Sequence, residues 1–267
     1  MKKTICIVLS VIMVLGMMFA FTACKGGNDK LICGVTIFDP MNYTDEAGNW
    51  TGFDTEFALL VGEKLGMEVE FQEIEWSSKY IELETGAISC IWNGFTANAN
   101  ESNGDKRSDL VDFTYSYMLN QQCVVVKADN AAEYTAIEVL AGKTAAAEKG
   151  SAGESLAIEA VGETGKIIDA AAQVNALTEV KAGAVDCAVI DVLLAKSLVG
   201  KGDYSDLTIA EIELDFEVYA IGFKKGSDLT AKVNKAISEL FNEGRMDELA
   251  AKYNLENTLQ LDENFKG

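Results

Sequence analysis

Hydrophobic runs and polar turns alternate along this chain from about residue 30 onward. Short apolar runs predict β-strands, and longer segments with apolar positions three and four residues apart predict α-helices. The predicted strands are residues 30–38, 67–75, 87–94, 143–150, 166–170, 185–191 and 213–225. The predicted helices are residues 53–66, 76–86, 151–163, 174–183 and 192–200, with two further helical stretches around Gly244 within residues 229–253.

Strands that alternate with helices are typical of α/β folds, in which mainly parallel sheets are joined by crossover helices. Ligands of open parallel sheets bind outside the carboxyl ends of the strands. The residues that directly follow the predicted strands are therefore candidates for a binding site. They are Phe38, Trp76, Asn93 to Thr96, Gly150, Ser151 and Asp191.

The N-terminal segment has the pattern of an export signal. Two lysines at positions 2 and 3 precede an apolar run from Ile5 to Phe21, and FTAC follows, ending at Cys24. This order of charged, apolar and small residues is typical of a secretory signal peptide. FTAC also resembles a bacterial lipobox, so we expect residues 1–23 to be removed and Cys24 to carry lipid. Residues 24–30 would then be a polar spacer, and the protein would be anchored on the outer face of the cell membrane.

Composition limits the classes of partner. The formal net charge is -20, and removing the two lysines of the signal would make it -22. Such an acidic chain is repelled by the phosphates of nucleic acid, so we expect no nucleic-acid partner. The hydrophobic content of 49% indicates a folded protein with a sizeable core.

The chain has no histidine, which excludes Ser-His-Asp catalysis and histidine-ligated metals. Four cysteines lie inside apolar, strand-like runs without a CxxC pair, and we interpret them as buried thiols in preference to disulfides or a metal site. They are Cys33, Cys90, Cys123 and Cys187. We therefore expect neither a metal nor a cofactor.

Six motifs occur in an order that resembles the amino-acid-type (family 3) extracellular solute-binding proteins of ABC importers. They are PMNYTDEAGNWTGFDTEFALLVGEKLG, WNGFT, the R-x-x-x-V-D-F-T of Arg107 to Thr114, KGSAGES, GAVDCAVID and the C-terminal YAIGFKKGSDLTAKVNKAISELFNEGRMDELAAKY. The resemblance runs from about Leu31 to Tyr253. It implies a two-lobed, periplasmic-binding-protein-like fold (type II), with residues 31–118 and 219–267 in lobe one and residues 119–218 in lobe two.

The resemblance also implies a function. A free amino acid would be held in the cleft between the lobes, and the closed protein, as a monomer, would deliver it to a permease coupled to an ATPase. Two other classes stay open: a sensor lipoprotein that binds its ligand without transport, and an enzyme like cyclohexadienyl dehydratase on the same scaffold. In such an enzyme Glu148 would be the general acid.

The family's contacts to the carboxylate of the amino acid map onto two places. Arg107 matches the arginine that grips the carboxylate with two parallel hydrogen bonds; the alternative is an exposed loop arginine. The family places this arginine five residues after the threonine that matches Thr96, whereas the spacing here is eleven, with the inserted residues within ANANESNGD, Ala97 to Asp105. Gly150, Ser151 and Ala152 match a helix start whose backbone N–H groups suit the same carboxylate.

The remaining contacts concern the ammonium and the side chain of the ligand. Gly94 and Thr96 match residues that meet the ammonium and carboxylate, and Asp191 matches the acid that pairs with the ammonium, with a helix-capping aspartate as the alternative. The family's two aromatic plates around the ligand side chain match the rings of Phe38 and Trp76.

Glu148 matches a position that faces the ligand side chain, although an exposed glutamate beside Lys149 is an equal alternative. A buried carboxylate needs a donor, which a cationic side chain or an amide such as glutamine would supply. We therefore expect a polar amino acid, with a slight preference for a basic one.

Overall fold

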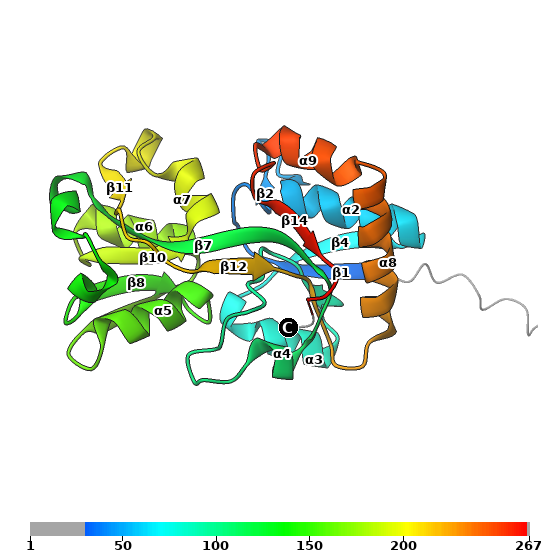
Figure 1. The fold of residues 1–267 in the computed structure, drawn as a ribbon, viewed down its shortest axis with the longest axis horizontal. Coiled ribbons are helices and arrows are strands. Elements are labelled where there is room, and N and C mark those ends of the chain that lie inside the picture. Colours follow the sequence, from blue (N-terminus) through cyan, green and yellow to red (C-terminus); the bar gives the residue numbers. More distant parts are fainter. Residues whose placement is uncertain (1–29, 266–267) are drawn as a thin grey trace, which may run out of the picture.

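The computed structural model describes residues 30–265, and the predicted signal peptide and lipidated cysteine lie outside them. Two β-sheets lie side by side, each with helices packed on it, and long strands run from one to the other (Figure 1). We call the part built on the first sheet lobe one and the part built on the second sheet lobe two. A short hairpin of β2 (Tyr43–Thr44) and β3 (Trp50–Thr51) belongs to neither sheet.

Lobe one contains a five-stranded sheet in the order β4-β1-β5-β13-β6. Its strands are β1 (Lys30–Val35), β4 (Glu68–Glu73), β5 (Cys90–Ile91), β6 (Asp112–Phe113) and β13 (Gly222–Phe223). β1 pairs in parallel with β4 and β5, whereas β13 is antiparallel to β5 and β6. The helices of this lobe are α2 (Phe53–Leu65), η1 (Trp76–Ser78), α3 (Lys79–Thr85), α4 (Arg107–Leu110), α8 (Asp228–Asn242) and α9 (Arg245–Tyr253).

Lobe two contains a sheet in the order β11-β7-β10-β8-β9. Its strands are β7 (Ser116–Lys127), β8 (Thr144–Glu148), β9 (Lys166–Ala170), β10 (Cys187–Asp191) and β11 (Leu207–Ile209). Two further strands, β12 (Phe216–Tyr219) and β14 (Leu259–Asp262), pair with the first half of β7, and β14 lies beside α9 in lobe one (Figure 1). Its helices are α5 (Ala152–Val161), α6 (Gln173–Ala182), α7 (Val192–Leu198), η2 (Ala128–Glu133), η3 (Ile137–Leu140) and η4 (Gly202–Tyr204).

Two antiparallel strands connect the lobes. β7 leaves lobe one and continues into the second sheet, and β12 returns beside it, with Met118 opposite Tyr219 and Gln121 opposite Phe216 (Figure 1). The predicted two-lobed α/β fold is confirmed, but both sheets are mixed, because β7 and β13 run against their neighbours.

Two predicted strands differ most from what the hydrophobic pattern suggests. Residues 213–225 were expected to form one strand, but they form β12 and β13, which belong to different sheets. Residues 87–94 contribute only Cys90–Ile91 to a strand, because the chain turns at Gly94, whose φ of 54° is left-handed. Apolar runs alone do not show where a chain passes from one sheet to another.

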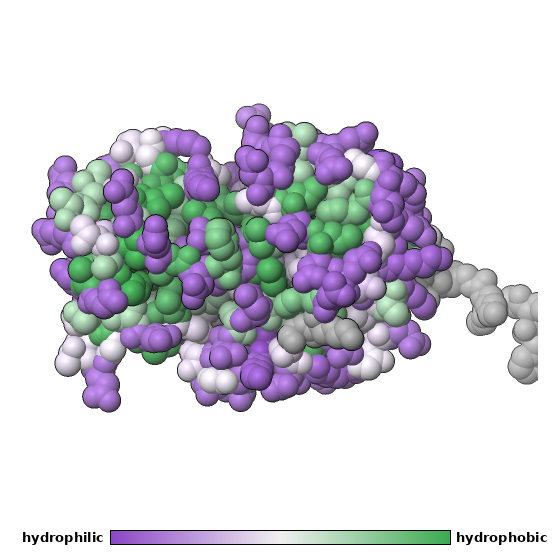
Figure 2. Space-filling view, in the orientation of Figure 1, coloured by the Kyte–Doolittle hydropathy of each residue, from purple (hydrophilic) through white to green (hydrophobic). Residues whose placement is uncertain are grey.

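The face of the molecule in Figure 2 is mixed in polarity. Figure 2 shows polar side chains over both lobes on one face, with hydrophobic patches between them. Leu59, Ile81, Ile158 and Phe216 are the large hydrophobic residues that are most exposed among residues 30–265. Within the same residues, no helix combines the length and apolar character needed to cross a membrane.

Candidate ligand-binding site

A small cavity, with a volume of about 10 Å³, lies between the lobes at the carboxyl ends of strands from both sheets. It is lined by Trp76, Asn93, Gly94, Thr96, Arg107, Glu148, Ser151, Ala152, Gln173 and Asp191. The binding residues predicted from the sequence are among these, except Phe38, Phe95 and Gly150. The ring of Phe38 is buried behind Gly94 and packs edge-on against Tyr219 at 6.4 Å.

The loop that carries Gly94 is held by Asp54 from the start of α2. One oxygen of Asp54 accepts a hydrogen bond from the Gly94 N–H at 2.7 Å, and the carboxyl group also accepts from the Tyr117 hydroxyl. A Cβ at Gly94 would lie 2.6 Å from the Phe38 ring, so only glycine fits. Burial raises the pKa of Asp54 to about 7. Asp54 thus positions the loop without lining the cavity.

Thr96 has different partners from those the family pattern suggests. Its hydroxyl donates to Glu217 at 3.2 Å, and its carbonyl accepts from Arg107 at 2.9 Å. Burial, followed by the charge of Asp191, raises the pKa of Glu217 to about 7. Glu217 lies on the returning strand β12 and was not predicted from the sequence.

Arg107 is fully buried at the cavity despite the insertion that precedes it, with 1% of the residue exposed. Its Nε donates to Glu101 at 2.8 Å, Nη1 donates to the Thr96 carbonyl, and Nη2 donates to the Gly150 carbonyl at 3.3 Å. A guanidinium group has five N–H donors. These three bonds fix its plane and leave one donor on each terminal nitrogen, which is the arrangement needed to grip a carboxylate.

A second buried cation, Lys79, was not predicted. It is 1% exposed, and its Nζ donates to the Gly150 carbonyl at 2.9 Å. Burial, followed by the charge of Arg107, lowers the pKa of Lys79 to about 8. The helical periodicity did indicate that Lys79 is buried, because Lys79 lies on the same helical face as the buried residues Trp76 and Leu83.

The start of α5 offers different donors from those expected. The N–H of Gly150 donates to the Glu154 carboxylate, and the N–H of Ser151 donates to the Glu148 carbonyl. The Ser151 hydroxyl caps the helix by accepting from the Glu154 N–H at 3.0 Å. The first-turn N–H groups of Ala152 and Gly153, which have no intrahelical acceptor, are therefore the donors that remain for an anion.

Asp191 ends β10 inside the cavity, but it is already well bonded. One of its oxygens accepts from Tyr219 at 2.7 Å and from the amides of Asn120 and Gln122, and the other accepts from Gln173 at 2.6 Å. The side-chain amide oxygen of Gln173, Oε1, in turn accepts a hydrogen bond from the backbone N–H of Asp191. Burial raises the pKa of Asp191 although these bonds oppose the shift.

Glu148 is buried, with 3% exposed, so the exposed alternative is wrong. Its Oε1 has no hydrogen-bond partner within the described part of the chain. Burial, followed by the charge of Asp191, raises the pKa of Glu148 to about 8. An unpartnered carboxyl group at a cavity wall calls for a donor from a ligand.

Metal ligation finds no support among residues 30–265, where no group of three His, Cys, Asp or Glu side chains could hold an ion. The four cysteines in this range are buried and unpaired, as interpreted from the sequence. Cys33 and Cys90 lie next to each other on β1 and β5, with their sulfurs 3.7 Å apart.

Known proteins resemble the whole described fold. The family described as bacterial extracellular solute-binding proteins, family 3, matches residues 31–256. The arginine-binding extracellular protein ArtP of Bacillus subtilis (strain 168) is 29% identical over 245 residues, which cover 88% of this chain and 92% of ArtP.

Solved structures show the same similarity. A structure of an ancestral arginine-binding protein bound to arginine has a TM-score of 0.75 and 29% identity, covering 84% of this chain and 97% of that chain. A structure of an ancestral arginine-binding protein bound to glutamine has a TM-score of 0.77 and 29% identity, covering 85% and 99%. The similarity therefore includes both lobes.

Proposed function

Because this chain belongs to the family 3 bacterial extracellular solute-binding proteins, we propose that it captures a free polar amino acid between its lobes and delivers it to the permease of an ABC importer. The resemblance inferred from the sequence motifs is thereby confirmed. The observation that supports the proposal most is that buried groups of both signs meet at the cavity. We call Arg107, Lys79 and the first N–H groups of α5 the cationic end, and Glu148 and Asp191 the acidic end.

The cationic end suits an α-carboxylate. Arg107 presents two free N–H donors, Lys79 adds a second positive charge, and the N–H groups of Ala152 and Gly153 point out of the helix start. A carboxylate transferred from water into a buried site needs such compensation.

The acidic end suits more than one positive charge. Glu148 and Asp191 both line it, and Glu217 lies behind Thr96. The α-ammonium would neutralise one carboxylate, and Asp191 is its proposed partner. Glu148, whose Oε1 is unpartnered, would remain for the ligand's side chain. We therefore propose a basic amino acid as the preferred ligand, with Trp76 as an aromatic wall. ArtP and the ancestral proteins are named for arginine, which agrees with this choice.

A thermal-shift screen tests the proposal. The purified mature domain would be melted with each of the twenty amino acids, ornithine and cystine. We expect arginine, lysine and ornithine to raise the melting temperature most, because a ligand that binds only the folded state stabilises it by mass action. Stabilisation by none of these compounds would contradict amino-acid binding. A preference for an acidic or apolar amino acid would contradict the role of Glu148.

Membrane attachment is a separate part of the proposal. Cys24 follows the apolar signal in FTAC, and lipid on this cysteine would hold the protein near its permease. Replacing Cys24 with alanine should move the protein from the membrane fraction to the soluble fraction, or block removal of the signal. Unchanged fractionation, together with an unchanged mass of the N-terminal peptide, would show that the anchor is wrong. We also propose that the protein is a monomer, with residues 31–118 and 219–267 in lobe one and residues 119–218 in lobe two.

A further inference from the structure

The structure assigns to Glu101, which lies in the insertion before Arg107, the role of a positioning residue. It holds Arg107 and Lys79 together against the carbonyl of Gly150 in the opposite lobe, and so completes the carboxylate end of the site as the lobes close. This inference rests on the proposed function, because it concerns the same ligand carboxylate.

Glu101 contacts both cations. Its Oε1 accepts from Arg107 Nε at 2.8 Å and from the Tyr80 hydroxyl at 2.6 Å, and its Oε2 lies 3.6 Å from Lys79 Nζ. The side chain is only 14% exposed, so these contacts are shielded from water. The orientation of the arginine therefore depends on a carboxylate from the inserted segment.

The two cations share an acceptor on lobe two. Lys79 Nζ and Arg107 Nη2 lie 2.9 Å and 3.3 Å from the Gly150 carbonyl oxygen. The lobes approach closely here, because a Cβ on Gly150 would lie 3.2 Å from the Cα of Ser77. Gly150 also has a φ of 77°, which favours glycine. The arrangement of the two cations therefore includes a contact with lobe two.

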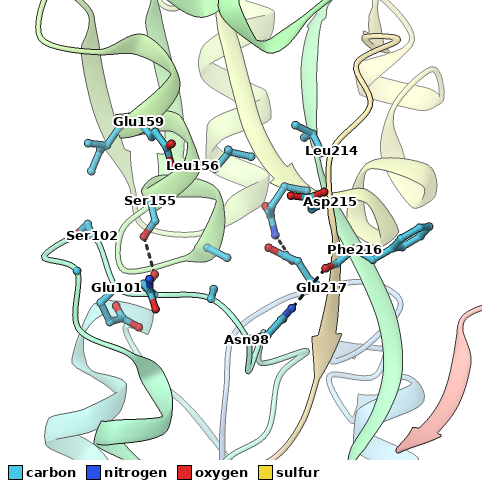
Figure 3. A pocket seen from close by; sticks show the side chains of 16 residues that line it. Asn98, Glu101, Ser102, Ser155, Leu156, Glu159, Leu214, Asp215, Phe216 and Glu217 are labelled. Carbon is cyan, nitrogen blue, oxygen red and sulfur yellow. Dashed lines mark hydrogen bonds between the residues drawn. The ribbon is translucent and has the colours of Figure 1, made fainter. Parts of the chain in front are cut away.

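The inserted segment also touches lobe two directly. Its Asn100 carbonyl accepts a hydrogen bond from the Ser155 hydroxyl of α5 at 3.2 Å, which Figure 3 marks across the groove between them. On its other side the segment is fixed by Asn98, whose side chain accepts from the Val218 N–H at 3.0 Å. The insertion thus connects lobe one to α5 and to the returning strand β12.

Charge explains why an acid is needed. Lys79 and Arg107 are both positive, share the Gly150 carbonyl and repel each other. The carboxylate of Glu101 reduces their combined charge from +2 to +1, which one ligand carboxylate can neutralise. The charged groups that face Lys79 are Arg107, Glu101 and Glu148, and the rings of Trp76 and Tyr80 lie beside it. Without the charge of Glu101, the pKa of Lys79 would be lowered further, because burial and Arg107 lower it and Glu148, with a pKa of about 8, carries little charge at pH 7 to oppose them.

The experiment compares Glu101→Gln with the wild type, using L-arginine and L-argininamide as probes in calorimetry between pH 6.5 and 8.5. We expect the variant to bind arginine about tenfold more weakly at pH 6.5, and the ratio of dissociation constants to grow as pH rises and Lys79 loses its proton. Argininamide has no carboxylate, so its ratio should stay near one. Glu101→Asp keeps the negative charge, so the ratio of its dissociation constant for arginine to that of the wild type should stay nearly constant between pH 6.5 and 8.5.

Glu159→Gln is the matched control, because Glu159 is an exposed glutamate that lines the same groove as Glu101 (Figure 3). The inference is overturned if Glu101→Gln binds arginine as the wild type does. It is also overturned if the variant loses both probes equally at every pH, which would indicate a structural role alone. A wild type that binds neither these probes nor any amino acid would instead refute the proposed function, and this inference with it.

Discussion

Replacing Arg107 with alanine should weaken amino-acid binding by a hundredfold or more. The guanidinium is buried, and the ligand carboxylate would lose its paired donors while still being removed from water. Removing one partner of a buried ion pair costs roughly 3–5 kcal/mol, and a hundredfold change corresponds to about 2.7 kcal/mol. Asp191→Ala should have an effect of similar size on the ammonium end. Isothermal calorimetry with the best ligand from the screen measures both.

Arg245→Ala provides the control for Arg107, because Arg245 is a surface arginine on α9 with one long contact to Glu248 at 3.7 Å. Its removal should leave affinity unchanged. Circular dichroism should show that Arg107→Ala is folded. If affinity for the amino acid falls less than tenfold in the folded variant, the ligand carboxylate binds elsewhere. Arg107 would then have only a structural role, in its contacts with the insertion.

Replacing Glu148 with glutamine should change the ligand preference. We expect affinity for arginine, lysine or ornithine to fall at least about thirtyfold, or about 2 kcal/mol, while glutamine binding changes little. The reason is that a buried carboxylate pairs with a cation, whereas an amide side chain can hydrogen-bond to either residue. Titration of both ligand classes into both proteins gives the comparison.

Proton linkage offers an independent test of Glu148. Its pKa of about 8 means that the group is largely protonated at pH 7 in the structure described here, and a cationic side chain beside it would lower that pKa. Binding of a basic amino acid should therefore release close to one proton at pH 7, and affinity should rise as pH increases from 6 to 8. Calorimetry in buffers of different ionisation enthalpy counts the proton.

Glu148→Gln should abolish this release, whereas Glu163→Gln, a change at an exposed glutamate after α5, should not. Equal proton release by the wild type and Glu148→Gln would assign the proton to another group. Asp191 and Glu217 would then be the next candidates, since burial raises the pKa of both.

The parts of the site that follow directly from strands were predictable. Asp191 and Glu148 come at or near the carboxyl ends of their strands, and that position places them at the cavity whatever else the chain does. Arg107 required the family pattern, because a loop arginine has no periodicity to show where it points. Its burial behind an insertion could not be derived from spacing alone.

The parts that escaped prediction depend on long-range pairing. Glu217 and Gln173 act through hydrogen bonds to Thr96 and Asp191, partners that are far away in sequence. The antiparallel pairing of β7 similarly joins residues about a hundred positions apart, as Gln121 with Phe216 shows. Lys79 was missed for a different reason, because a lysine is ordinarily assigned to solvent unless its buried partners are known.

Because the native cysteines are buried, dyes can be attached to introduced cysteines to measure the distance between the lobes. Cys33, Cys90, Cys123 and Cys187 are shielded, and burial raises the pKa of Cys33 and Cys187, so little reactive thiolate forms. A maleimide dye would therefore react selectively with cysteines introduced at exposed positions of the mature domain expressed from residue 25. One dye in place of Glu159 and another in place of Asn103 would report the width of the groove in single molecules, without removal of native thiols.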